Sequence, residues 1–152
     1  MQRRKFLSLS VLTAVAAVVP AANAEDFRVT KPTVWTAHTV DDAVMAMYGT
    51  KATIESGITI KMPDEAANGA AVPINIKSDI DTNSIAIFQN ANPESAVAAF
   101  TVHENSIIDY DLQIKLKSVG TPITVTVVAE GKDGKLYSEN KTITVALGGC
   151  EG

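Results

Sequence analysis

The single cysteine of the 152-residue chain, Cys150, is the side chain best suited to covalent chemistry. A thiolate is a nucleophile that forms and releases sulfur–sulfur bonds. Cys150 lies in the run Gly148-Gly149-Cys150-Glu151-Gly152. Because glycine loses more conformational entropy on ordering than any other residue, we expect residues 148–152 to form a flexible arm. A mobile thiol lacks the fixed neighbours of a catalyst, so this pattern predicts a covalent carrier that presents Cys150 to other proteins.

The remaining candidates for chemistry are two histidines and two carboxylate pairs: His38, His103, Asp79 with Asp81, and Asp109 with Asp111. A metal site needs several convergent His, Cys or carboxylate groups, and neither histidine has a ligand-spaced partner. Carboxylate pairs of this kind are usually solvated. We therefore predict no catalytic residue, no metal and no cofactor among these candidates. The chain is predicted to be non-catalytic.

Residues 1–24 have the pattern of a secretory signal peptide. A basic start, Arg3-Arg4-Lys5, precedes the apolar stretch Phe6–Val19 and the small-residue site Ala22-Asn23-Ala24. The apolar stretch is too short for a membrane anchor, which needs about 20 residues. The arginine pair resembles the twin-arginine export signal, which carries folded cargo, and an ordinary Sec signal is the alternative. We expect cleavage after Ala24 and a periplasmic location.

The chain that remains after cleavage would be acidic and about the size of one domain. Removing three of the thirteen Lys and Arg residues leaves ten, against seventeen Asp and Glu, a formal charge of −7. Such a charge makes nucleic acid and anionic membranes poor partners. We expect residues 25–147 to form one folded domain, followed by the arm at 148–152.

Period-two alternation of apolar residues predicts about seven short strands and an immunoglobulin-like β-sandwich. The predicted strands are 58–62, 72–77, 85–87, 98–102, 110–117, 123–127 and 142–147. Turn signals separate them, and the strongest is Asp133-Gly134, a dipeptide typical of tight hairpins. Breaks are also predicted at Gly120-Thr121-Pro122 and at Asn92-Pro93.

One short helix is expected before the strands. Apolar residues from Val40 to Tyr48 recur at helical spacing, with Thr39 as the N-cap and Gly49 as the C-terminal residue. The segment before this helix, Glu25 to Thr36, shows neither period and is predicted to be a loose arm.

The terminal run resembles the Gly-Gly-Cys-Gly-Gly terminus of the SoxY family. The twin-arginine signal, the short helix, the Ala71-Val72-Pro73 strand and the all-β remainder extend the resemblance over most of the chain. It implies that Cys150 is the residue to which sulfur intermediates of thiosulfate oxidation are conjugated, and that Gly148, Gly149 and Gly152 belong to the arm. Glu151 departs from the family glycine, and its carboxylate would disfavour a neighbouring thiolate and repel anionic sulfur species.

The resemblance also implies partners. The family's carrier forms a heterodimer with a small β-sandwich subunit, SoxZ. A haem c enzyme, SoxXA, conjugates thiosulfate to the cysteine, and a dimanganese hydrolase, SoxB, then removes sulfate. In some bacteria a molybdenum–haem dehydrogenase, SoxCD, oxidises the remaining sulfane sulfur.

Two other interpretations of the sequence remain open. An exported structural or adhesive immunoglobulin-like module would use Cys150 for a fixed interchain disulfide. A small sulfur-transfer enzyme would need basic groups near the thiol, and the run around Cys150 offers only Glu151. The position of the cysteine among glycines favours the carrier.

Overall fold

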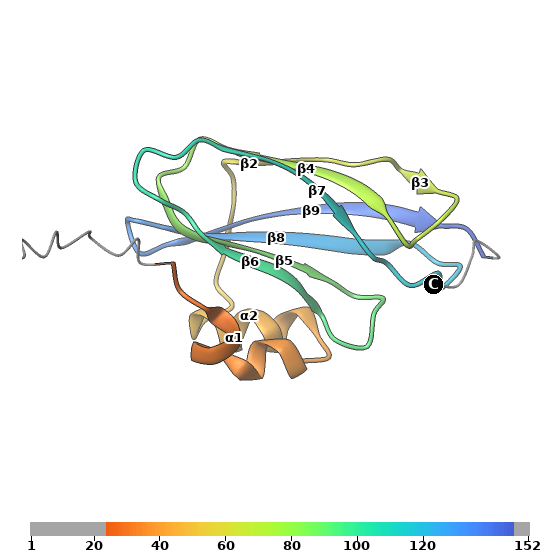
Figure 1. Cartoon of the computed structure of the whole chain (residues 1–152), viewed down its shortest axis with the longest axis horizontal. Helices are drawn as coiled ribbons and strands as arrows, with labels where there is room; N and C mark the ends of the chain where they lie inside the picture. The colour runs from red at the N-terminus through yellow and green to blue at the C-terminus, as the bar shows by residue number, and fades with distance from the viewer. Residues whose placement is uncertain (1–23, 148–152) are drawn as a thin grey trace, which may run out of the picture.

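The computed structural model describes residues 24–147, which form a two-layer β-sandwich with helices on one side (Figure 1). The elements are α1 (Phe27–Thr30), the 3₁₀-helix η1 (Pro32–Thr36), α2 (Val40–Tyr48), β1 (Ile54–Glu55), β2 (Ile58–Lys61), β3 (Glu65–Ala66), β4 (Val72–Ser78), β5 (Thr82–Gln89), β6 (Ala96–Thr101), β7 (Ile108–Ile114), β8 (Ile123–Gly131) and β9 (Leu136–Val145). None of the helices in this range is long and apolar enough to cross a membrane.

The strands form two sheets. The larger has the order β1-β9-β8-β5-β6, with β3 also paired to β9, and the smaller has the order β2-β4-β7. Neighbouring strands are antiparallel, except that β1 and β3 run parallel to β9. The predicted immunoglobulin-like sandwich is confirmed, and each of the seven predicted strands has its counterpart. The two additional strands, β1 and β3, are two residues long, too short for alternation to reveal them.

The core between the sheets follows from the alternation. On β4, Val72, Ile74 and Ile76 are buried, while the residues between them are exposed or partly exposed. The partner strand β7 keeps the same rhythm, with Ile108 and Ile114 buried at its ends. The smaller sheet therefore has one dry face and one wet face, as antiparallel sheets commonly do.

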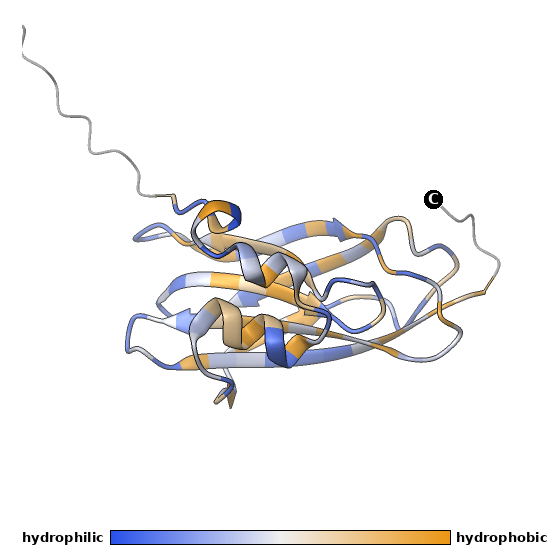
Figure 2. Cartoon of the chain, turned by 90° about the horizontal axis from the view of Figure 1, so that it is seen from below, coloured by the Kyte–Doolittle hydropathy of each residue, from blue (hydrophilic) through white to orange (hydrophobic). Residues whose placement is uncertain are grey.

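The larger sheet is covered on its outer face by the helices, which form a second core with it (Figures 1 and 2). Met47 of α2 packs there with Phe88 of β5, and both are almost fully buried. As a result β5 is buried on both faces from Ser84 onward. A strand buried on both faces loses its alternation, which is why only a short run at 85–87 was predicted.

The prediction that Glu25 to Thr36 is a loose arm is wrong. This segment forms α1 and η1, and it buries Phe27 and Val34 in the second core. Asp26 caps α1 by accepting a hydrogen bond from the Arg28 N–H. These helices are only four and five residues long, too short to be stable by themselves or to show a periodic pattern. Contacts with the sheet therefore stabilise them.

The predicted helix at 40–48 is confirmed as α2, together with both of its ends. The Thr39 hydroxyl accepts from the Asp42 N–H at 3.1 Å. Gly49 adopts φ 74°, and its N–H donates to the Met45 carbonyl at 2.8 Å. A left-handed residue at this position satisfies a carbonyl that the helix leaves open.

The Asp133-Gly134 hairpin is also confirmed, and it joins β8 to β9. Gly134 has φ 79°, and the Gly131 N–H donates to the Lys135 carbonyl at 2.8 Å.

The predicted strands 110–117 and 142–147 end two or three residues earlier than expected. Leu116 is buried but lies beyond β7, because its N–H donates to the Gly69 carbonyl instead of to a strand. The last strand ends at Val145, and Leu147 is 72% exposed.

Candidate functional site

Cys150, predicted as the point of sulfur attachment, lies outside the described residues 24–147. So do Gly148, Gly149, Glu151 and Gly152 of the predicted arm. The structure does describe the part of the sandwich from which that segment continues. We call it the exit end, and it comprises the end of β9 (residues 143–147) and the loops 62–71, 90–95 and 115–122. Figure 1 shows β3 beside the tip of β9 at this end.

The last residues of β9 are held from both sides. Toward β8, Ile143 pairs with Ile123. Toward β3, the N–H groups of Thr144 and Ala146 donate to the carbonyls of Asp64 and Ala66, each at 2.9 Å. The carboxylate of Asp64 also binds the ammonium group of Lys141 at 2.9 Å. β9 is therefore fixed as far as Ala146.

The chain passes from the core to the surface over two residues. Val145 is completely buried, whereas Leu147 is largely exposed and lies against Gly120. A Cβ atom at Gly120 would be 2.7 Å from Leu147 Cδ1, and the φ of Gly120 is +69°. The predicted break at 120–122 is thus a turn that leaves room for the residues following β9.

A buried glutamine organises the loop 90–95. Gln89 has no exposed surface, and its Oε1 accepts from the N–H groups of Ala91 and Asn92 at 2.6 and 2.7 Å. Its Nε2 donates to the Glu94 carbonyl at 2.7 Å, and its own carbonyl accepts from the Ser95 hydroxyl at 2.8 Å. Each polar atom of this side chain has a partner, which is the condition for burying an amide without cost.

Asn92 joins this loop to the segment after β7. Its Nδ2 donates to the Lys115 carbonyl at 2.8 Å, and its Oδ1 accepts from the Lys117 N–H at 2.7 Å. Between them, Leu116 bonds to Gly69, where an added Cβ would lie 2.0 Å from the Leu116 oxygen. Three loops of the exit end are therefore bound to one another around the end of β9.

The histidines show no catalytic arrangement. His38 is exposed, with Nδ1 2.8 Å from the Pro93 carbonyl, and His103 is exposed in the loop after β6. Within residues 24–147 there is no group of three or more His, Cys, Asp or Glu side chains that could hold a metal ion.

Three of the four paired carboxylates serve structural contacts. Asp81 binds Lys132 at 2.9 Å. Asn75 donates to both Asp109 and Asp111 at 2.8 Å, and Lys77 binds Asp109 at 2.9 Å. The hydrogen bonds from Asn75 and Lys77 lower the pKa of Asp109 below its ordinary value. These contacts therefore favour the carboxylate form of Asp109.

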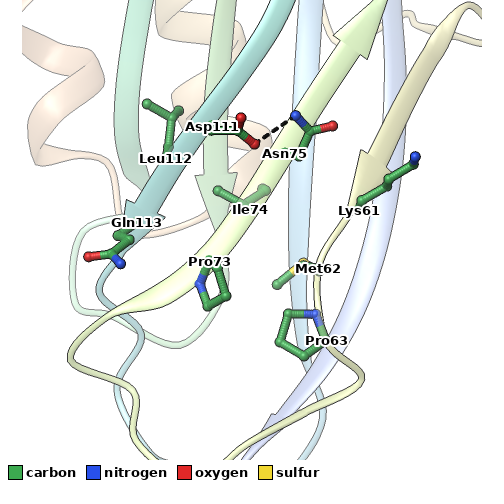
Figure 3. Close-up of a pocket in the computed structure, with 9 residues that line it drawn as sticks. All are labelled: Lys61, Met62, Pro63, Pro73, Ile74, Asn75, Asp111, Leu112 and Gln113. Atoms are coloured by element: carbon green, nitrogen blue, oxygen red, sulfur yellow. Dashed lines mark hydrogen bonds between the residues drawn. The ribbon is translucent and has the colours of Figure 1, made fainter.

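An open groove lies on the wet face of the smaller sheet (Figure 3). Its lining residues are Lys61, Met62, Pro63, Pro73, Ile74, Asn75, Asp111, Leu112 and Gln113. Met62 and Pro63 belong to the loop 62–71, so the groove adjoins the exit end. It combines apolar and hydrogen-bonding groups, and its one acid, Asp111, is bonded to Asn75.

The residues that build the exit end were not predicted. Gln89 bonds to backbone groups of its own loop, whereas Asn92 and the Asp64 carbonyl bond to backbone groups of distant segments. The only signal was a polar glutamine at the end of the apolar run that includes Phe88, followed by the Asn92-Pro93 break. That signal marks a turn but does not say what the turn binds.

Comparisons with known proteins agree with this geometry. The family model for the sulfur oxidation protein SoxY matches residues 44–150. The chain belongs to the SoxY family. The matched range begins within α2, contains the sandwich from β1 to β9 and reaches Cys150.

Solved structures give the same fold. The sulfur carrier protein SoxY from Chlorobium limicola f thiosulfatophilum is 31% identical, with a TM-score of 0.62 over 71% of this chain and 96% of that one. Superoxide reductase (neelaredoxin) from Ignicoccus hospitalis is 12% identical, with a TM-score of 0.51 over 60% of this chain and 81% of that one, a likeness of fold alone. The comparison with curated proteins found no match.

Proposed function

We propose that this chain is a covalent carrier of sulfur intermediates in periplasmic thiosulfate oxidation, with Cys150 as the attachment point. The observation that carries the proposal is the SoxY family match, which extends through residue 150 and so includes the only cysteine. The similar protein from Chlorobium limicola is itself described as a sulfur carrier.

The exit end supports this role by fixing the point from which the carrier segment starts. β9 is paired with β8 up to Ile143, the chain is bonded on the β3 side up to Ala146, and Leu147 lies at the surface. Three further residues reach Cys150 and span at most about 10 Å. The thiol can therefore be offered to an enzyme while the sandwich keeps a constant shape.

The chemistry needs only a thiolate on this chain. Joining Cys150 to thiosulfate forms a sulfur–sulfur bond and releases two electrons, which the haem enzyme SoxXA would accept. Hydrolysis by SoxB would then cleave the terminal sulfonate as sulfate and leave a persulfide on Cys150. SoxCD would oxidise that sulfane sulfur where the host has it. A SoxZ-like β-sandwich subunit would be the constant partner.

Export belongs to the same proposal. Its support is the Arg3-Arg4 pair and the Ala22-Asn23-Ala24 site of the sequence. Replacing both arginines with lysine should leave an uncleaved precursor in the cytoplasm. Normal periplasmic amounts of the Lys-Lys form would contradict the twin-arginine route.

Cys150→Ser tests the carrier role. In a mixture with SoxZ-like subunit, SoxXA, SoxB and SoxCD, the variant should reduce thiosulfate-dependent electron transfer to background. Its melting temperature should change by less than about 2 °C, because the glycine-rich run around Cys150 offers little to pack. Glu151→Gly is the matched control and should retain transfer.

Other outcomes would point elsewhere. Electron transfer at the ordinary rate by Cys150→Ser would exclude Cys150 as the attachment point. A fall of many degrees in melting temperature, with loss of a covalent dimer, would instead support the adhesive module with an interchain disulfide.

A further inference from the structure

The edges of the two sheets differ in how they are protected. An exposed edge invites pairing with other chains, and natural proteins blunt it with short strands or charged side chains. On the smaller sheet, the edge strand β2 carries Lys61 and the edge strand β7 carries Asp109 and Asp111. On the larger sheet, one edge is formed by the two-residue β1. The other edge is β6, Ala96–Thr101, which has no charged residue.

The exposure of β6 arises at its outer edge, where the Glu25 N–H donates to the Thr101 hydroxyl at 3.1 Å but no strand of residues 24–147 pairs with it. β6 lies between the same layers as its neighbour β5, with Phe100 toward the core between the sheets and Ala99 toward the helices. Yet β5 is almost entirely buried, whereas every residue of β6 is partly exposed. A bulge near Val97 shifts the pairing with β5, so the regular part of the edge is Ala98–Thr101.

The ladder with β5 shows which backbone groups are available. The Val102 N–H donates to the Asn83 carbonyl at 2.8 Å, and Thr101 and Ala99 follow in register opposite Ser84 and Ala86. Because antiparallel pairs alternate between bonded and non-bonded, the N–H and C=O groups of Thr101 and Ala99 point away from β5. In residues 24–147 no strand pairs with them.

The surroundings of this edge are acidic. The acidic residues beside it are Glu25 and Asp26, which line a groove with β6, and Glu94 and Glu104, which flank the strand in sequence and are exposed. Arg28 in the same groove stacks over the Trp35 ring at 4.1 Å. An antiparallel pair of two copies of this chain would bring these acids together, so charge disfavours self-pairing and favours a basic partner.

We propose that β6 is a docking edge that receives a β-strand from a different β-domain, whose own edge is flanked by basic residues. The partner strand extends the larger sheet by bonding to Ala99 and Thr101. This inference deepens the proposed function and rests on its β-sandwich partner subunit, because it assigns the surface on which that subunit binds.

Amide hydrogen exchange on the unaltered chain tests the proposal, with the SoxZ-like subunit as the probe. The amides of Ala99 and Thr101 should exchange rapidly in the free chain and slow by roughly tenfold or more in the complex. Those of Ala98 and Phe100 are already bonded to β5 and should be slow in both states. Rapid exchange at Ala99 and Thr101 within a stable complex would overturn the proposal.

Substitutions provide a second readout. Ala99→Pro removes the outward N–H, which an edge strand tolerates, and should abolish the complex while Ala99→Ser, with its N–H intact, preserves it. Reversing Glu94 and Glu104 to lysine should slow association by on the order of tenfold at low salt. Glu139→Lys, three strands away on β9, is the control and should have little effect.

The failures can be told apart. A complex that forms without protecting Ala99 and Thr101 refutes the docking edge and leaves the partner in place. Absence of any complex refutes both the docking edge and the partner subunit. The covalent chemistry at Cys150 is tested separately, by mass spectrometry of the peptide that contains it. A homodimer that protects these amides would replace the basic partner with a second copy of this chain.

Discussion

At the exit end of the sandwich three loops are bonded to one another beside the fully buried Gln89, whereas at the opposite end exposed loops are joined through Lys132, whose N–H and ammonium group both bind Asp81. At the exit end Gln89 closes its own loop, while Asn92 and the Asp64 carbonyl connect segments far apart in sequence. The opposite end contains the turn at 131–135 and the loop 102–107, in which Ile107 is 86% exposed. There the Asp133 carboxylate bonds only to Lys135 and Tyr137 of its own hairpin.

This difference shows where the fold needs a constant shape. The same strands run through both ends, so strand stability alone does not explain the buried glutamine at one of them. The exit end is the place from which the segment containing Cys150 continues. The carrier function proposed for Cys150 would need a fixed origin for the segment that follows Leu147, and the bonds of the exit end provide one.

The largest effect is expected at Gln89. Gln89→Ala would leave the N–H groups of Ala91 and Asn92 and the Glu94 carbonyl without their partner and should lower the free energy of unfolding by about 3 kcal/mol. Denaturant titration measures this. Gln113→Ala, on the wet face of β7, is the matched control and should change stability by less than about 0.5 kcal/mol. An equal loss of unfolding free energy in the two variants would show that the bonds of Gln89 do not stabilise the exit end.

A smaller effect is expected from an added methyl group at Gly69. Because the new Cβ would lie 2.0 Å from the Leu116 carbonyl oxygen, backbone must move, and Gly69→Ala should cost about 2 kcal/mol. Gly134→Ala at the opposite end meets no neighbour and pays only for its φ of 79°, about 1 kcal/mol. Thermal unfolding of both variants measures which one loses more stability. A larger loss for Gly134→Ala than for Gly69→Ala would contradict the tight packing of the exit end.

The smallest effect is expected at Asp133. Hydrogen bonds from the Tyr137 hydroxyl and the Lys135 N–H lower the pKa of Asp133 below its ordinary value. A lowered pKa in the folded state means stability that is present at neutral pH and lost as pH falls through that pKa. The unaltered chain should therefore have a higher free energy of unfolding than Asp133→Asn at pH 7. This difference, measured by denaturant titration at each pH, should vanish in acid.

Tyr137→Phe sharpens this prediction. The variant removes one of the two hydrogen bonds, so the pKa of Asp133, followed by NMR titration, should move back toward its ordinary value. An unchanged pKa of Asp133 would show that the hydrogen bond from Tyr137 does not stabilise the Asp133 carboxylate in solution.

Much of the fold could be predicted because its signals are local. The helix at Val40–Tyr48 carries its own cap and stop, the Asp133-Gly134 turn carries its own φ preference, and the strands with one wet face alternate. The segment 25–36 was missed because Phe27 and Val34 are ordered by the outer face of the larger sheet. No periodic pattern in so short a segment can indicate that contact.

The candidate site was predictable only in part. Cys150 stands out because a lone cysteine among glycines is unusual, and the family match reaches it. The exit end was not predictable, because Asn92 acts on a backbone group of a distant segment and the burial of Gln89 depends on the whole sandwich. A glutamine after an apolar run has no local feature that distinguishes a buried loop organiser from a solvated strand end.

The mass of one tryptic peptide tests the central claim most directly. Cleavage after Lys141 releases Thr142 to Gly152, which contains the only cysteine. After incubation with thiosulfate and SoxXA, this peptide alone should gain the mass of one thiosulfate, and SoxB should then shorten the adduct to a single added sulfur. A peptide that stays unmodified with the full enzyme set, or that is found only as an interchain disulfide, would contradict the carrier function.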